Sequence, residues 1–177
     1  MSIYDVINHR IGEGRLFPMT HRLGFPPVRH ILASKEIYEL VQAGPWQSTQ
    51  WRSRGSALGA DLDRFIDGSL INVALPSNAK PYRRTPSAYL RLLHKWADEV
   101  WEIRSVTASP SLRVFGRFAD IDLFVALTWD TRARLATPPW RNAQISCKAE
   151  WTKLLYPYPA ITGVNLNDYI STNAVSV

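Results

Sequence analysis

The chain has little of what disulfide-rich and metal-binding proteins use, with one cysteine, Cys147, and four histidines among 177 residues. A single cysteine cannot form an intramolecular disulfide or a cysteine-based zinc site. The histidines never approach HExxH spacing, and the run Asp61-x-Asp63-x-x-x-Asp67 lacks the glycine and terminal glutamate of an EF-hand loop. We therefore predict no metal and no cofactor, and cysteine usage favours a reducing, cytoplasmic location.

Long hydrophobic runs are also missing. No segment approaches the roughly 18 apolar residues that read as a membrane helix, and the start, MSIYDVINHR, lacks the apolar core of a signal peptide. We expect no export and no membrane partner. Aromatic residues are plentiful, with seven Trp, seven Tyr and six Phe, and a chain so rich in them is expected to fold compactly.

Acidic residues are in deficit, with 15 Asp and Glu against 21 Lys and Arg and a net charge of +6. The excess lies in residues 1–95, which hold 13 basic and 7 acidic residues, whereas residues 96–177 hold 8 of each. Arginine outnumbers lysine, and its planar fork suits phosphate oxygens. Anionic partners are favoured electrostatically. The alternative is a solvated basic surface, which the charge alone favours.

The first part of the chain predicts two helices, over residues 34–44 and 56–68, each beginning with a capping serine and ending at glycine. A short strand is predicted over residues 70–75. The proline-punctuated segment 76–86 follows and suggests a module boundary near residue 80. We expect residues 1–80 to form a mainly helical extension.

Further along, capping by Thr85 and helical spacing of apolar residues predict a helix over residues 86–100. Three strands are predicted at 101–106, 112–118 and 121–129, joined as a meander. A final helix is predicted from Thr137 to Leu154, covering the apolar face of the sheet.

These elements predict an α+β fold, with a small antiparallel sheet of three to four strands packed against helices behind an N-terminal helical extension. We assign residues 81–157 to this module and residues 158–177 to a packed C-terminal tail. The three segments can equally form one compact domain.

Alternation along the strands separates apolar from charged side chains. In the middle strand Leu112, Val114 and Phe118 share one face, while the other carries arginines. We expect the charged face of the sheet to bear Glu102, Arg104, Arg113 and Arg117.

The order of helix, W-E-I-R strand, arginine-bearing meander and final helix resembles the RelE/ParE toxin superfamily, especially its HigB-like branch, over roughly residues 86–155. In that family Trp or Leu followed by E-L-R opens the sheet, and R-V or R-I begins the next strand. Residues 101–104 and 112–114 match these motifs, and 123–129 match the third strand. The chain departs in the following basic turn, where Arg132 and Arg134 replace the usual lysines.

The resemblance implies a toxin of a toxin-antitoxin system that acts as an mRNA endonuclease. Its implied partners are RNA, bound on the ribosome in many relatives, and an antitoxin protein; one branch instead poisons DNA gyrase. It implies phosphate-stabilising roles for Arg104 and Arg113 and a base role for Glu102. The expected RNA-binding residues are Arg117, Arg132, Arg134, Arg83 and Arg84.

Two other interpretations stay open. The same sheet face can serve a non-catalytic module that binds nucleic acid or protein, since a fold does not fix an activity. Alternatively, the charge is incidental and the protein assembles through its aromatic surface.

Overall fold

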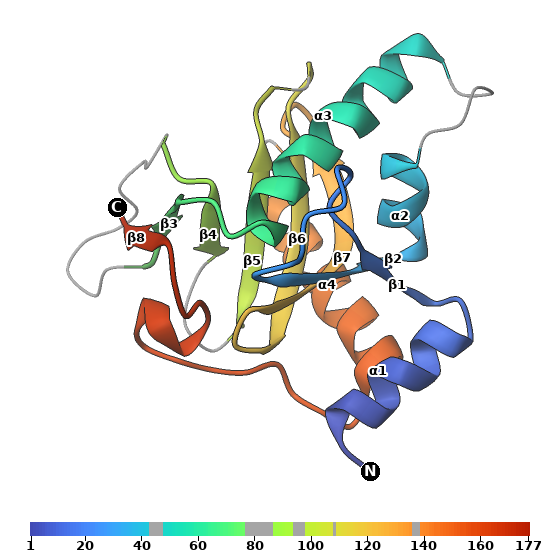
Figure 1. The fold of residues 1–177 in the computed structure, drawn as a ribbon, viewed down its shortest axis with the longest axis vertical. Helices are drawn as coiled ribbons and strands as arrows, with labels where there is room; N and C mark the ends of the chain where they lie inside the picture. Colours follow the sequence, from blue (N-terminus) through green and yellow to red (C-terminus); the bar gives the residue numbers. More distant parts are fainter. Residues whose placement is uncertain (43–47, 77–86, 94–97, 108, 136–138) are drawn as a thin grey trace.

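The computed structural model describes residues 1–42, 48–76, 87–93, 98–107, 109–135 and 139–177. Its centre is a mixed sheet in the strand order β1-β2-β7-β6-β5-β4-β3-β8 (Figure 1). The strands are β1 Leu16–Met19, β2 His30–Ser34, β3 Ile71–Ala74, β4 Leu90–Leu93, β5 Val100–Ser105, β6 Leu112–Asp120, β7 Leu123–Thr131 and β8 Ala174–Ser176. The helices are α1 Ile3–Gly12, α2 Lys35–Val41, α3 Thr49–Ile66 and α4 Pro139–Leu155, with a short 3-10 helix, η1, at Leu166–Asp168.

The prediction of a small antiparallel sheet is wrong, because the sheet has eight strands and mixed pairing. The meander β5–β6–β7 is present and antiparallel, but it occupies the middle of the larger sheet. On one side β2 pairs with β7 in parallel, and on the other β3 pairs with β4 in parallel. Strand β2 is buried at four consecutive positions, so it lacks the alternation by which a half-exposed strand is recognised.

The predicted helix over residues 86–100 is also wrong within the described residues, because Leu90–Leu93 form strand β4. This strand pairs antiparallel with β5, so that Leu92 lies opposite Trp101. Buried residues on both faces of a short strand produce a spacing that also fits a helix. The predicted start of this helix at residues 85–86, and its residues 94–97, lie outside the described residues.

Helices cover both faces of the sheet (Figure 1). Leu58, Leu62 and Phe65 of α3 join the core on the face that carries Trp101 and Val114. Helix α4 lies on the opposite face, and its buried residues Cys147, Trp151 and Leu154 join Phe115 and Val125 of the sheet.

The final helix therefore does not cover the face for which it was predicted. The face that carries the arginines of β6 also presents Val100, Phe115 and Leu127, all at most 1% exposed. These apolar side chains require a covering layer of their own. Helix α3 occupies the face assigned to α4, and it begins at Thr49, earlier than the predicted start near residue 56.

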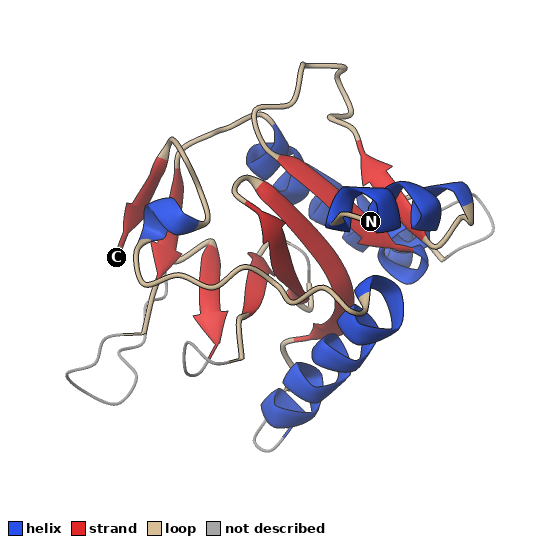
Figure 2. Cartoon of the chain, turned by 90° about the horizontal axis from the view of Figure 1, so that it is seen from below, coloured by secondary structure: helices blue, strands red, loops and turns tan. Residues whose placement is uncertain are grey.

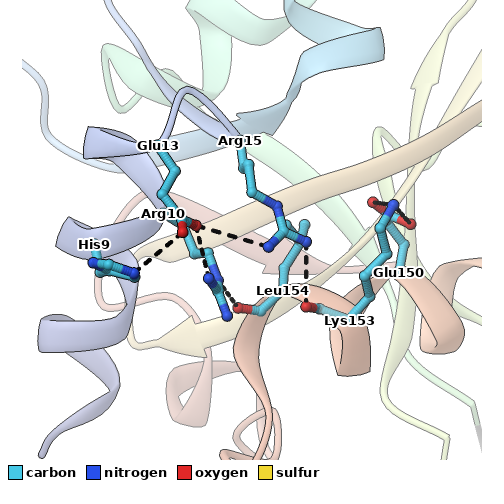
Figure 3. A network of polar contacts seen from close by, with 7 residues as sticks. All are labelled: His9, Arg10, Glu13, Arg15, Glu150, Lys153 and Leu154. Carbon is cyan, nitrogen blue, oxygen red and sulfur yellow. Dashed lines mark hydrogen bonds and ion pairs between the residues drawn. The ribbon is translucent and has the colours of Figure 1, made fainter.

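The two ends of the chain complete the sheet and its outer layer. Strand β8 pairs with β3 at one edge, and α1 lies toward the other (Figure 2). Arg10 of α1 donates from Nε to the carbonyl of Leu154 at 2.9 Å, and Arg15 donates to that of Lys153 at 3.5 Å (Figure 3). These side chains supply donors to carbonyls at the end of α4, where cations are favourable.

Among the helices that the structure describes, none is both long enough and apolar enough to cross a membrane.

Candidate functional site: arginines around a buried glutamate

The strand register brings four of the charged residues onto one face of the sheet. Glu102 of β5 lies opposite Arg91 of β4, and Arg104, two residues further along β5, lies opposite Arg113 of β6. Side chains at paired positions of neighbouring strands point to the same side. The sequence therefore grouped Glu102, Arg104 and Arg113 as the structure does.

Glu102 lies between two arginines at ion-pair distance. Its Oε1 is 3.8 Å from Nη1 of Arg91, and its Oε2 is 3.7 Å from Nε of Arg113. Both distances exceed hydrogen-bond length, and Glu102 Oε2 and Arg113 Nε have no hydrogen-bond partner. The side chains of Glu102 and Arg113 are only 1% and 4% exposed. The two buried charges are thus close but incompletely satisfied.

Backbone carbonyls fix the direction of two of these guanidiniums. Arg113 donates from Nη1 to the carbonyl of Leu112 at 2.7 Å. Arg104 donates from Nη1 to the carbonyl of Ala88, the residue two positions before β4, at 3.2 Å. The arginines are therefore held in place by their own sheet, which lowers the entropy that a ligand must remove.

Burial dominates the electrostatics of the site. It raises the pKa of Glu102, an effect that Arg113, Arg91, Arg104 and Arg132 oppose. Burial likewise lowers the pKa of Arg113 to about 10, and repulsion from Arg104, Arg132 and Arg91 acts in the same direction while Glu102 opposes it. We call Arg91, Arg104, Arg113 and Arg132, gathered around Glu102, the arginine cluster. Arg91 and Arg113 lie at ion-pair distance from Glu102, and a second carboxylate, that of Asp130, lies opposite Arg113 in β7. The four guanidiniums still outnumber these two carboxylates, so positive charge is in excess.

Arg132 joins the cluster from the turn that follows β7. Its backbone N–H donates to the carbonyl of Ser111 at 2.7 Å, which ties the turn to the start of β6. Arg134 lies nearby but is 79% exposed, and its Nε is 3.5 Å from Oδ1 of Asp130. An exposed pair of this kind contributes little to stability.

The structure separates Arg117 from the cluster. Its Nε donates to the carbonyl of Glu99 at 3.3 Å, and its guanidinium carbon lies 5.1 Å from the ring centroid of Trp151 in α4. Arg117 is four positions along β6 from Arg113, roughly 13 Å away at strand spacing. It is half-buried beneath α4, and its surroundings suit packing rather than ligand binding.

Arg83 and Arg84 lie outside the described residues. The sequence did not identify Arg91 as a site residue, because residues 86–100 were predicted to form a helix. The signal that identifies it is the L-R-L alternation of residues 90–92, which in a strand next to β5 places the arginine beside Glu102.

Chemically, the cluster suits an anion with several oxygens. Guanidiniums bind phosphate or carboxylate oxygens in charge-assisted, often bidentate pairs. Glu102 is too deeply buried to meet a ligand in this state, and its position favours a role in holding the arginines. Among the described residues, no group of three or more His, Cys, Asp or Glu side chains could hold a metal ion.

Comparison of the chain with models of protein families, with curated proteins and with solved structures finds no significant match.

Proposed function

We propose that the protein binds RNA by its phosphates at the arginine cluster. The observation that carries this proposal is the pair of arginines, Arg91 and Arg113, at 3.8 and 3.7 Å from Glu102. Arg104 lies opposite Arg113 in the strand register, and Arg132 lies in the turn tied to the start of β6. Like charges at this density repel each other and are costly to desolvate. A bound phosphate would supply negative charge that the cluster lacks.

The choice of RNA among polyanions is supported by the sequence. Trp101–Arg104 and Leu112–Val114, which resemble motifs of the RelE/ParE superfamily, are the segments that supply Glu102, Arg104 and Arg113 to the cluster. An arginine fork recognises phosphate without reading base identity. The proposal therefore predicts phosphate-dependent binding with little sequence preference from the cluster itself.

Binding can be measured by fluorescence anisotropy with a labelled decamer of uridine at several salt concentrations. Replacement of Arg104 by Gln removes one guanidinium and is expected to weaken binding and to reduce the slope of log affinity against log salt by about 0.7, the single-strand value for one phosphate contact. Arg52→Gln is the matched control, because Arg52 is exposed on α3, which covers the opposite face. No binding by the unaltered protein, or equal losses in both variants, would contradict the proposal.

The second candidate function is the cleavage of mRNA by a toxin. The observation that favours it is the Glu102 carboxyl, which lies within 3.8 Å of Arg91 and Arg113 and has a raised pKa, because acid–base catalysis needs a titratable group near stabilised charge. This function requires the buried carboxyl to become exposed when RNA binds. Controlled expression is then expected to arrest growth, and Arg113→Ala to relieve the arrest. If the protein binds RNA, produces no RNA fragments on a gel and does not affect growth, the RNA-binding function is kept and the toxin function is rejected.

A further inference from the structure

Arg132 differs from the buried members of the cluster because it is exposed and lies on an aromatic ring. Its guanidinium carbon is 5.5 Å from the ring centroid of Trp140, in the first turn of α4. The residue as a whole is exposed, whereas Trp140 is half-buried. A cationic plane packed over an indole is a favourable cation–π contact.

The position of this pair is fixed by contacts on both sides. Nη1 of Arg132 donates to the carbonyl of Leu135 at 3.5 Å. The ring of Trp140 meets the ring of Phe115 edge to face, with centroids 6.0 Å apart and planes at 90°, and Phe115 is 1% exposed. The guanidinium therefore rests on an aromatic stack anchored in the sheet, and it needs little reorganisation to accept a partner.

The same guanidinium acts electrostatically on Glu102 and Arg113. The backbone N–H of Arg132 also donates to the carbonyl of Ser111, two residues before Arg113, at 2.7 Å. A nucleotide whose base reached Arg132 would therefore have its phosphate on the side of the sheet that carries Arg113. Bases of unpaired RNA stack on guanidinium planes and aromatic rings, whereas in a duplex the base faces are occupied by neighbouring pairs.

We propose that the pair Arg132 and Trp140 is a stacking platform for an unpaired base, so that the site takes single-stranded RNA in preference to a duplex. This inference rests on the proposed binding of RNA phosphates at the arginine cluster. It adds a second means of recognition, because phosphate contacts alone do not distinguish a strand with bases from one without them.

The test compares three labelled probes at one salt concentration: a uridine decamer, an abasic decamer of the same backbone, and a ten-base-pair RNA duplex. The unaltered protein is expected to bind the uridine decamer about tenfold more tightly than either other probe. Arg132→Lys keeps the positive charge but removes the plane, and it is expected to weaken uridine decamer binding about tenfold and abasic binding no more than threefold. Trp140→Leu is expected to have the same selective effect.

Arg52→Lys serves as the control for an exposed arginine on the other face and is expected to leave all three affinities unchanged. Equal affinity of the unaltered protein for uridine and abasic decamers would overturn the stacking platform and leave phosphate binding intact. The platform would also be overturned if Arg132→Lys weakened both decamers equally or neither of them. Failure of the unaltered protein to bind any probe would instead remove the proposed function itself.

Discussion

Cys147 shows how burial determines the chemistry of a single residue. Its thiol lies fully buried between α4, to which it belongs, and the sheet, and burial raises its pKa to about 12, with Arg117 opposing the shift. Because the thiolate is the reactive form, we expect no reaction with a disulfide reagent such as DTNB at pH 8 in the folded protein. One equivalent is expected to react in guanidinium chloride. Prompt reaction of the native protein would show that the α4 face opens readily.

Glu99 is a second buried acid, and it predicts how stability depends on pH. Its Oε2 accepts a hydrogen bond from the hydroxyl of Tyr169 at 2.7 Å, and burial raises its pKa. The folded protein therefore holds the proton more tightly than the unfolded chain, and the resulting stabilisation is full below the ordinary pKa and is lost as pH rises through the raised value.

Glu99→Gln keeps a similar shape and an acceptor for Tyr169 but cannot ionise. We expect its free energy of unfolding, measured by urea denaturation between pH 4 and 8, to depend less on pH than that of the unaltered protein. Relative to the unaltered protein, the free energy of unfolding of the variant should be most favourable near pH 8. Identical pH profiles would show that Glu99 does not titrate differently on folding.

The charged residues of the sheet show how far the sequence predicts the position of single side chains. Alternation placed Glu102, Arg104 and Arg113 on one face, because the pleat fixes that relation once a strand is recognised. The same alternation placed Arg117 on this face, but α4 covers Arg117 only because of the tertiary packing, which the alternation does not predict. To predict the position of Arg91, one must know that residues 90–93 form a strand and that this strand lies beside β5. A single short apolar run determines neither.

At the scale of elements, Arg29 joins the end of α3 to the C-terminal segment. Its side chain is fully buried, and it donates to the carbonyls of Phe65, Thr172 and Asn173 at 3.4, 2.8 and 3.0 Å. One guanidinium thus satisfies carbonyls of a helix terminus and of the segment that leads into β8.

Arg29→Met fills the space but supplies no donors. The carbonyls of Phe65 and Asn173 keep backbone donors, from Gly68 and Ile71, whereas that of Thr172 loses the donor it has from Arg29. We expect a loss of about 1 to 3 kcal/mol in the free energy of unfolding, the usual cost of leaving a buried polar group without its hydrogen-bond partner. Arg64→Met is the control, because Arg64 is exposed on α3 and contacts the ring of Tyr89, and it should cost less than about 1 kcal/mol. Similar losses from both substitutions would contradict this role for Arg29.

The elements that the sequence predicted well are those with a strong local signal. Helix α2 and strands β5, β6 and β7 lie close to their predicted positions, because helical spacing and strict alternation of apolar residues act within a few residues. The predicted cap of α2, Ser34, makes no side-chain hydrogen bond, and Gly44 lies outside the described residues. The parallel pairs, β2 with β7 and β3 with β4, join segments that are far apart in the chain. Their pairing is therefore a property of the assembled sheet.

At the scale of the molecule, the sheet draws strands from all three segments that the sequence suggested as separate units. Strand β2 of the first segment lies beside β7, and β8 of the last lies beside β3. Tyr169 in the C-terminal segment is fully buried, with its ring 4.7 Å from that of Trp101 in β5. The core of the central meander is thus completed by residues from both ends of the chain.

This arrangement predicts that the chain unfolds as one unit and that residues 81–157 do not fold alone. A fragment with this span lacks α3, whose Leu58, Leu62 and Phe65 cover the face that carries Trp101, and it leaves β7 without its parallel neighbour β2. Exposed apolar surface and an open sheet edge both favour aggregation over folding. We expect tryptophan fluorescence and far-ultraviolet circular dichroism of the full chain to report one coincident urea transition, and the fragment to show none. A cooperative transition in the fragment would establish residues 81–157 as an autonomous domain, to which the other strands of the sheet add without being needed for folding.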